Sequence, residues 1–285
     1  MLGMKRLTAM VLVLLALMGM CARAVGGEPF LNVEPNAVYA ADLNGDGANE
    51  DFMLSYREED DAECLWLQVT DANGAVSEYR TCISTHVGLW LTNYDGLVVV
   101  ITGYDADNVA YTYILRYSAS RHIQELMFSA DSREKVPEEY FTACGYGLIA
   151  SMNRESITLE GNVDVLGTWP ALRTYRFSEN GRFVMVDGLW ETSLKPDNPD
   201  VWSYPALTAV KEIEYTDDNG ETDALQAGTR ILITATDKES IARFVTQDGK
   251  TGTLSIYPAN SSDIYLFSVN DVPETDLFRF VPYAG

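Results

Sequence analysis

Residues 42–50 carry oxygen-bearing side chains at a spacing that suits a metal ion. With Asp42 as position 1, such side chains stand at positions 1, 3, 5 and 9, and a glycine at position 6 permits a sharp turn. Position 7 is an alanine, which offers only its backbone carbonyl. Because Ca²⁺ binds six to eight oxygens at about 2.3–2.6 Å, this spacing predicts a calcium loop. The predicted ligands are Asp42, Asn44, Asp46, Ala48 and Glu50.

Two other interpretations of this loop stay open. An EF-hand loop begins in the same way, but it needs a bidentate Glu at position 12, where this chain has Met53. It also needs flanking helices, whereas residues 52–56 are typical of a strand. The Asn-Gly-Asp-Gly run can equally form a polar turn without metal, because these residues favour turns. We expect calcium, with an empty turn or another ion as the alternatives.

The elements around the loop are predicted to be strands. Alternating or β-branched runs recur between Asx-Gly turns, which is the pattern of an all-β protein. One short helix around 132–141 is the exception, and Pro137 limits its length. Between the loop and residue 190, the predicted strands are 51–57, 63–70, 76–82, 97–103, 109–117, 122–128, 147–151, 155–160, 171–178 and 182–187.

The turns mark a faint internal repeat. A turn similar to Asn44–Gly47 occurs 49 residues later at Asn93–Gly96. A third turn, Cys144–Gly147, occurs a further 51 residues on. Each is followed by an apolar strand, a polar hairpin and further strands. A period of about 45–50 residues with three or four strands is the size of a propeller blade.

On these residues, the N-terminal part resembles FG-GAP/VCBS-type β-propeller repeats. The resemblance covers residues 40–57, where the loop leads into the strand at Asp51–Leu54. In that family the loop binds calcium through positions 1, 3, 5, 7 and 9, which implies the five ligands named above. The second repeat has Leu91 at position 1 and the third has no carboxylate, so neither is expected to bind metal. Three repeats fit a propeller-like domain that is open or incomplete, or a curled sheet sandwich.

The C-terminal part of the sequence has a different pattern, with short strands and tight turns. A stretch rich in Pro and Asx at 195–203 is predicted to link a repeat domain at 25–194 to a second domain at 204–285. In the second domain, strands at 231–236, 241–245 and 253–256 alternate with short turns.

The order of these strands resembles a bacterial Src-homology-3-like barrel. The resemblance covers about 222–257 and includes the hairpin tip at Asp248–Gly252. It implies a small barrel, with Phe278 and residues 282–285 as a tail packed against it. Such barrels often bind cell-wall peptides or proteins, and a packing or spacer role is the alternative.

Residues 1–24 have the pattern of a secretory signal peptide. Lys5 and Arg6 precede an apolar run, and Ala22–Ala24 is a small-x-small cleavage site. We therefore expect a secreted or cell-surface protein cleaved near Ala24, with lipidation of Cys21 as the alternative. No later stretch reaches the roughly 18–20 apolar residues of a membrane span.

The net charge of the chain argues against some classes of binding partner. It has 42 acidic and 20 basic residues and a formal net charge of −22. Because phosphate binding needs clustered Lys and Arg, nucleic acid and anionic membranes are poor partners.

Three cysteines follow the signal peptide. Cys64 and Cys82 are nearly equidistant from the turn at 71–74, so a hairpin would bring them close together. A register change of one residue would place them on opposite faces, so a Cys64–Cys82 bridge stays one of two alternatives. Cys144 is expected to be a small buried hydrophobic residue.

No motif in the sequence indicates catalysis. His86 and His122 lie outside metal and nucleophile motifs. We predict a non-catalytic binding or adhesion protein whose partner is a cell-wall component, an extracellular protein or a glycan. The alternatives are a cell-envelope hydrolase or its accessory or inhibitor, and a carbohydrate-binding module that uses loop tryptophans such as Trp169 and Trp202.

Overall fold

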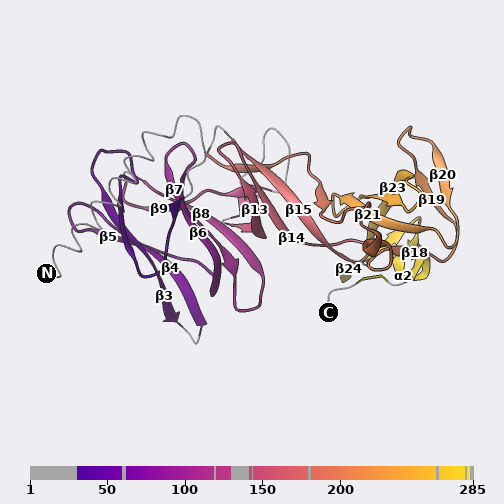
Figure 1. The fold of residues 1–285 in the computed structure, drawn as a ribbon, viewed down its shortest axis with the longest axis horizontal. Coiled ribbons are helices and arrows are strands. Elements are labelled where there is room, and N and C mark those ends of the chain that lie inside the picture. Colours follow the sequence, from indigo (N-terminus) through magenta and orange to yellow (C-terminus); the bar gives the residue numbers. More distant parts are fainter. Residues whose placement is uncertain are drawn as a thin grey trace. The chain divides into compact units, whose positions relative to one another are not determined.

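The computed structural model confirms an all-β protein (Figure 1). Its only described helical elements are the short η2 (Pro199–Trp202) and α2 (Glu274–Leu277). The predicted signal peptide with Cys21 and Ala24, and the predicted helix up to residue 140, lie outside the described residues. In the part described, no helix is long and apolar enough to cross a membrane. The described residues are 31–59, 62–118, 120–129, 141–142, 144–178, 181–260, 263–279 and 281–282.

The chain forms two compact units. The first contains the chain up to Leu159 together with Thr174–Met185, and the second contains Glu160–Arg173 and Val186–Gly285. The predicted linker at 195–203 lies inside the second unit, where it forms η2. The division differs because β17 (Trp190–Thr192), which lies before that stretch, pairs with a strand of the C-terminal sheet.

Three antiparallel meanders follow one another along the chain. The first is β2 (Val38–Ala41), β3 (Glu50–Glu59), β4 (Ala62–Thr70) and β5 (Val76–Arg80). The second is β6 (Thr85–Asn93), β7 (Leu97–Tyr104), β8 (Ala110–Tyr117) and β9 (Ile123–Glu125). The third is β13 (Leu148–Met152), β14 (Ser156–Asp164), β15 (Thr168–Phe177) and β16 (Phe183–Met185).

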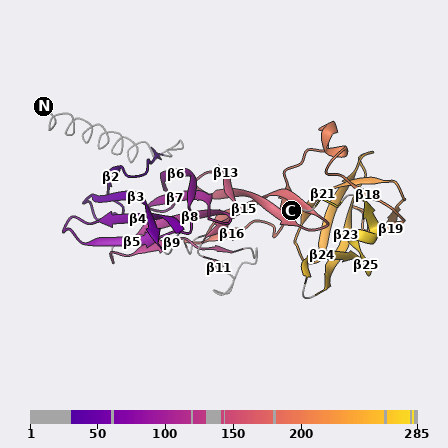
Figure 2. The same cartoon turned by 90° about the horizontal axis from the view of Figure 1, so that it is seen from below.

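Short strands extend two of these meanders. β1 (Leu31–Asn32) pairs with β6, and β12 (Gly145–Tyr146) pairs with β8. β10 (Phe128–Ser129) pairs in parallel with β16 and antiparallel with β11 (Phe141–Thr142). Figure 2 shows the strands of the first two meanders within the first unit. The predicted turns at 44–47 and 93–96 connect β2 to β3 and β6 to β7, whereas 144–147 precedes β13, and none of the described sheets closes on itself.

A shared apolar core lies between the first two meanders. Leu54 and Leu65 of the first and Leu91 and Ile101 of the second belong to this core, and each is at most 1 % exposed. Burial of each such side chain contributes roughly 1.5–3 kcal/mol. Leu43, inside the predicted calcium loop, belongs to the same core. The core therefore fixes the position of that loop.

The second unit is built on the strand order β21-β22-β23-β19-β20. In the predicted C-terminal tail, Phe278 is buried. The carbonyl of Pro282 accepts a hydrogen bond from the Thr168 amide. The predicted strands at 231–236, 241–245 and 253–256 are present. The strands of this unit after β17 are β18 (Leu207–Ala209), β19 (Ile213–Thr216), β20 (Thr222–Leu225), β21 (Arg230–Thr236), β22 (Ile241–Thr246), β23 (Thr251–Asn260), β24 (Asp263–Val269), β25 (Val272–Pro273) and β26 (Phe278–Arg279).

The core between the meanders predicts the effect of truncating Leu54. Leu54→Ala should lower the free energy of unfolding by about 2–5 kcal/mol, because it removes a fully buried side chain and leaves a cavity. Val38→Ala is the control, since Val38 is 66 % exposed; it should change the free energy by no more than about 0.5 kcal/mol. Denaturant unfolding measures both, and equal values for the two variants would contradict the assigned core.

Candidate functional site

The predicted calcium loop is the connection of the β2–β3 hairpin. Ala41 pairs with Glu50 and closes the loop. Gly45 and Gly47 have φ values of 77° and 89°, a left-handed conformation that glycine adopts without steric cost. The sequence predicted the second strand of this hairpin but missed β2, which has only four residues.

Three side chains of the loop fold back onto its own backbone. The carboxylate of Asp42 accepts hydrogen bonds from the amides of Gly45, Asp46 and Gly47 at 2.8, 3.1 and 2.9 Å. Asn44 Oδ1 accepts from the Asp46 amide at 2.9 Å, and Asp46 Oδ1 accepts from the Ala48 amide at 2.8 Å. The loop is therefore ordered by its own polar side chains.

Glu50 brings the end of the loop back to its beginning. Its Oε2 accepts from the Leu43 amide at 2.8 Å, and its Oε1 accepts from Asn44 Nδ2 at 2.9 Å. Asn44 Nδ2 also donates to Asp46 Oδ2 at 3.2 Å. The structure thus brings the predicted side chains of positions 1, 3, 5 and 9 together in one loop, and Ala48 joins them through its backbone.

The buried carboxylate of Glu50 is the electrostatic feature of this loop. Glu50 is 1 % exposed. Burial raises the pKa of its carboxyl group, the Leu43 amide lowers it, and the charges of Asp46 and Asp42 raise it again. The net effect is a raised pKa, caused mainly by burial, which disfavours the charged form of the carboxyl group.

The donor set suits a hard cation, since carboxylate, amide and carbonyl oxygens are the ligands of calcium. Among the described residues, no group of three or more His, Cys, Asp or Glu side chains is placed to hold a metal by itself. An ion would therefore also need Asn44 and the backbone carbonyl of Ala48. In this structure the Asn44 side-chain amide links the two carboxylates by donating to Asp46 and Glu50.

The other candidate residues from the sequence have packing or hydrogen-bonding roles in the fold. In the second repeat, Leu91 is buried, and Asn93 Oδ1 accepts from the Gly96 amide as in an ordinary turn. His86 Nδ1 lies 2.6 Å from the hydroxyl of Tyr56. The prediction that Trp169 and Trp202 lie in exposed loops is wrong. Both are buried, and each indole donates to a backbone carbonyl.

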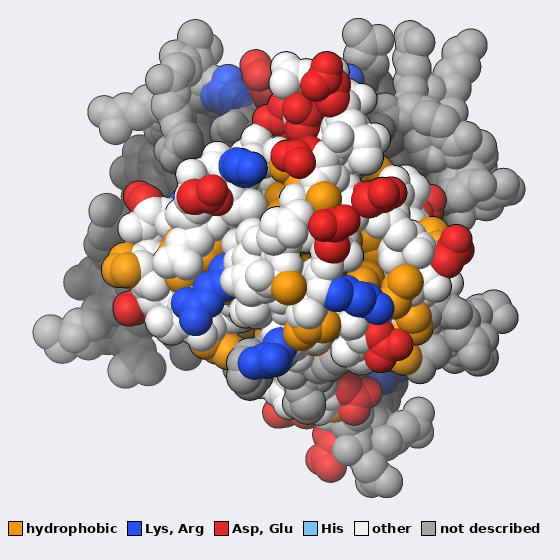
Figure 3. All heavy atoms as spheres, turned by 90° about the vertical axis from the view of Figure 1, so that its right-hand side faces the viewer, with side chains coloured by type: hydrophobic (Ala, Val, Ile, Leu, Met, Phe, Trp, Pro, Cys, Tyr) orange, Lys and Arg blue, Asp and Glu red, His pale blue; other side chains and the backbone are white. Residues whose placement is uncertain are grey.

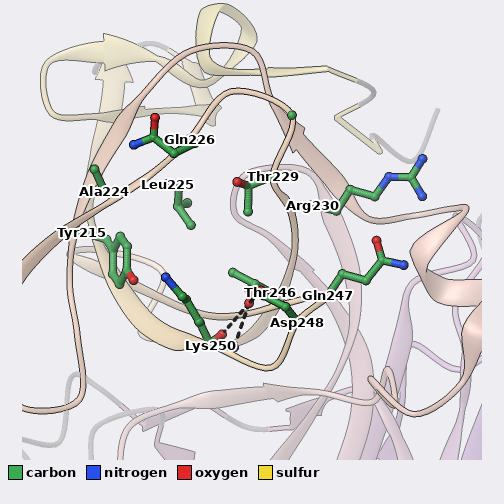
Figure 4. Close-up of a pocket in the computed structure, with 11 residues that line it drawn as sticks. Tyr215, Ala224, Leu225, Gln226, Thr229, Arg230, Thr246, Gln247, Asp248 and Lys250 are labelled. Carbon is green, nitrogen blue, oxygen red and sulfur yellow. Dashed lines mark hydrogen bonds between the residues drawn. The ribbon is translucent and has the colours of Figure 1, made fainter.

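The second unit contains a polar pocket of about 460 Å³ (Figure 4). Figure 4 shows the amino group of Lys250 pointing toward Tyr215, while Arg230 and Gln247 extend toward the other side. The size is that of a small-molecule or short-peptide site. The pocket is lined by Tyr215, Ala224, Leu225, Gln226, Gly228, Thr229, Arg230, Thr246, Gln247, Asp248 and Lys250.

Ring packing and a hydrogen bond hold the side chain of Tyr215 in place at one side of this pocket. Its ring packs edge-on against Phe244 with centroids 5.0 Å apart, and a Cβ on Gly252 would come within 2.4 Å of it. Its hydroxyl donates to Asp223 Oδ2 at 2.9 Å. Lys250 Nζ lies 3.9 Å from the same oxygen.

The ion pair between Lys250 and Asp223 is weak, because both side chains are more than half exposed. Lys250 is therefore available to a ligand, and Gln226, Thr229 and Gln247 add polar groups that form hydrogen bonds. Sequence reasoning found the hairpin tip that carries Lys250 but missed β19 and β20, so it did not identify the pocket.

Comparison with known proteins returned no match to any family model, curated protein or solved structure.

The raised pKa of Glu50 predicts a pH dependence in metal-free buffer. The folded protein keeps this proton at pH values where the unfolded chain has released it. Its contribution to the free energy of unfolding is therefore present at low pH and is lost as pH rises from the ordinary glutamate range through the raised pKa. Glu50→Gln should lack this fall.

Denaturant unfolding from about pH 4 to pH 7 in a chelator measures this contribution as the difference between wild type and variant. Glu58→Gln is the control, since Glu58 is exposed on the same strand. A wild-type curve parallel to that of Glu50→Gln would contradict the assigned environment of Glu50.

Proposed function

We propose that this chain is a secreted or cell-surface, non-catalytic binding protein whose first unit is stabilised by calcium. The observation that carries the proposal is the buried carboxylate of Glu50 beside Asp42 and Asp46 in one loop. Side chains of Asp42, Asn44, Asp46 and Glu50 and the carbonyl of Ala48 would hold the ion. A divalent cation would offset the negative charge of the carboxylates in this loop.

Calcium in this loop would act on stability rather than on chemistry. The loop joins β2 to β3, and Ala41 and Leu43 at its start belong to the core between the first two meanders. An ion that binds the folded loop and not the unfolded chain stabilises the fold by mass action.

Propeller-like FG-GAP/VCBS repeats and an Src-homology-3-like barrel remain our proposals for the finer architecture. The three successive antiparallel meanders support the first. The strand order β21-β22-β23-β19 in the second unit supports the second.

The polar pocket of the second unit supports the binding part of the proposal. Its lining of amides, hydroxyls and one available ammonium group suits a polar ligand such as a cell-wall peptide or a glycan. Nucleic acid is a poor candidate for a chain of net charge −22. On the face that Figure 3 shows, acidic side chains gather at one edge and the Lys and Arg side chains are scattered.

Calcium should raise the melting temperature of the protein. At about 100 times the dissociation constant, binding adds ~2.7 kcal/mol to the free energy of unfolding. This corresponds to a rise of roughly 5–10 °C for a domain of this size. Asp46→Ala should abolish the rise, because it removes an exposed ligand without disturbing the core. Differential scanning calorimetry with calcium and with chelator measures it.

The matched control is Asp107→Ala. Asp107 is an exposed acid in another turn of the same unit and lies outside the predicted ligand set. This variant should keep the full calcium response. Identical melting curves of the wild type in chelator and in calcium would overturn the proposed metal site.

The polar pocket predicts a second result. The double variant Lys250→Ala, Gln247→Ala should bind envelope ligands about 30–150-fold more weakly, because each lost polar contact costs about 1–1.5 kcal/mol. Sedimentation with insoluble peptidoglycan and a glycan array supply the two ligand classes. Lys211→Ala, an exposed cation away from the pocket, is the control. Unchanged binding of the double variant would exclude the pocket as the site.

A further inference from the structure

Cys82 and Cys144 lie against one side chain, although 62 residues separate them in the sequence. The hydroxyl of Tyr113 donates a hydrogen bond to Cys82 Sγ at 3.0 Å. The side chain of Cys144 interacts with the same hydroxyl. Both cysteines are half-buried and pack against the core between the first two meanders.

The residues around Tyr113 place the two sulfur atoms in one cluster. Tyr79 packs edge-on against Tyr113, with ring centroids 6.3 Å apart. Tyr79 and Tyr111 each lie within electrostatic range of both Cys82 and Cys144. Gly145 of β12 pairs with Thr112 of β8, which places Cys144 beside Tyr113 and therefore near Cys82.

Cys64 has a different hydrogen-bond partner. Its side chain is 6 % exposed, and its Sγ accepts a hydrogen bond from Arg80 at 3.6 Å. The regular β4–β5 pairing ends at Arg80. The amide of Leu65 then donates to the carbonyl of Ile83, and the carbonyl of Leu65 accepts from the amide of Thr81.

Residue 82 therefore bulges out of the β4–β5 ladder. Its amide donates to the Tyr113 hydroxyl of β8 at 3.3 Å, which turns Cys82 toward the second meander. All three cysteines in the described part of the chain are free thiols, so the Cys64–Cys82 bridge considered from sequence is not formed. The bulge is the physical reason, because it removes Cys82 from the position opposite Cys64.

We propose that Cys82 and Cys144 are a redox pair that closes to a disulfide in the presence of an oxidised thiol compound. One cysteine thiolate attacks the disulfide of the oxidant, forming a mixed disulfide and releasing one thiol. The second cysteine attacks the protein sulfur of that mixed disulfide and releases the second thiol. The two protein thiols lose two electrons and two protons in total, and one disulfide of the oxidant becomes two thiols.

The environment of the pair sets its reactivity. Burial raises the pKa of Cys82, and burial together with the nearby Cys82 raises the pKa of Cys144 to about 11. Few thiolates exist at neutral pH, so closure is slow there and becomes faster as pH rises. Such thiols suit a structural cross-link better than a catalytic nucleophile.

The cross-link would join the segment after β5 to the segment before β12. It would close a long loop of chain, which restricts the unfolded state and raises the melting temperature by about 5–15 °C. This inference is independent of the proposed calcium site, because none of its residues belongs to the loop at 42–50.

The test uses the chain with Cys21→Ser, oxidised with glutathione disulfide and compared with a dithiothreitol-treated sample. Thiol counting in denaturant should fall from three reactive thiols to one, with a mass loss of ~2 Da. Peptide mapping should find Cys82 linked to Cys144 and Cys64 free. A Cys64–Cys82 link, a glutathione adduct on either cysteine as the end product, or three free thiols would overturn the proposal.

Variants separate the cross-link from general oxidation. Cys64→Ser should keep the linked peptide and the rise in melting temperature. Cys82→Ser and Cys144→Ser should each lose both. If a serine variant does not fold, the mapping of the wild-type chain still decides, because it identifies the linked residues without a substitution at either of them.

Discussion

Each meander of the first unit has an apolar face that only a neighbouring sheet covers. A single sheet would leave its apolar face in water, so the first two meanders depend on the core that they share. The shared core also fixes the positions of the loop at 42–50 and of the two half-buried cysteines. Leu43 anchors the calcium loop to the core, and Cys82 and Cys144 pack against the same core from different parts of the chain.

Turn chemistry separates the proposed calcium loop from the other Asx turns. Backbone amides, those of Ala75 and Glu221 first, lower the pKa of Asp71 and Asp217 in their turns, as expected when amides stabilise a carboxylate. The pKa of Glu50 is raised instead, although it also accepts a backbone amide. The loop at 42–50 thus differs from these turns in holding one buried carboxylate, that of Glu50, close to two other carboxylates. A polar turn alone does not need this arrangement, whereas a cation site does.

Much of the fold was predictable because strands and turns leave local signals. Alternation identified β3, β4, β7 and β8, and the Asx-Gly pairs at 73–74 and 95–96 identified the turn after β4 and the turn before β7. β6 was missed because Gly88, whose Cβ would overlap the ring of Trp90, interrupts the pattern. The close approach of the side chains of Asp42, Asn44, Asp46 and Glu50 was predictable because a loop of nine residues is local in sequence.

Long-range features were not predictable. The partner of Cys82 depends on a bulge at the end of β5, and the pocket depends on β19–β20 meeting the tip of the β22–β23 hairpin. Neither the bulge nor that meeting leaves a pattern in adjacent residues.

The two stabilising devices proposed for the first unit act on different states. Calcium binds the folded loop and leaves the unfolded chain unchanged, so its effect depends on calcium concentration. A Cys82–Cys144 disulfide mainly restricts the unfolded chain, so its effect depends on redox conditions and not on a ligand. Both conditions, millimolar calcium and oxidised thiols, are met outside cells. Both proposed devices, the calcium loop and the disulfide, lie in the first unit. The pocket of the second unit could therefore bind a ligand without taking part in either.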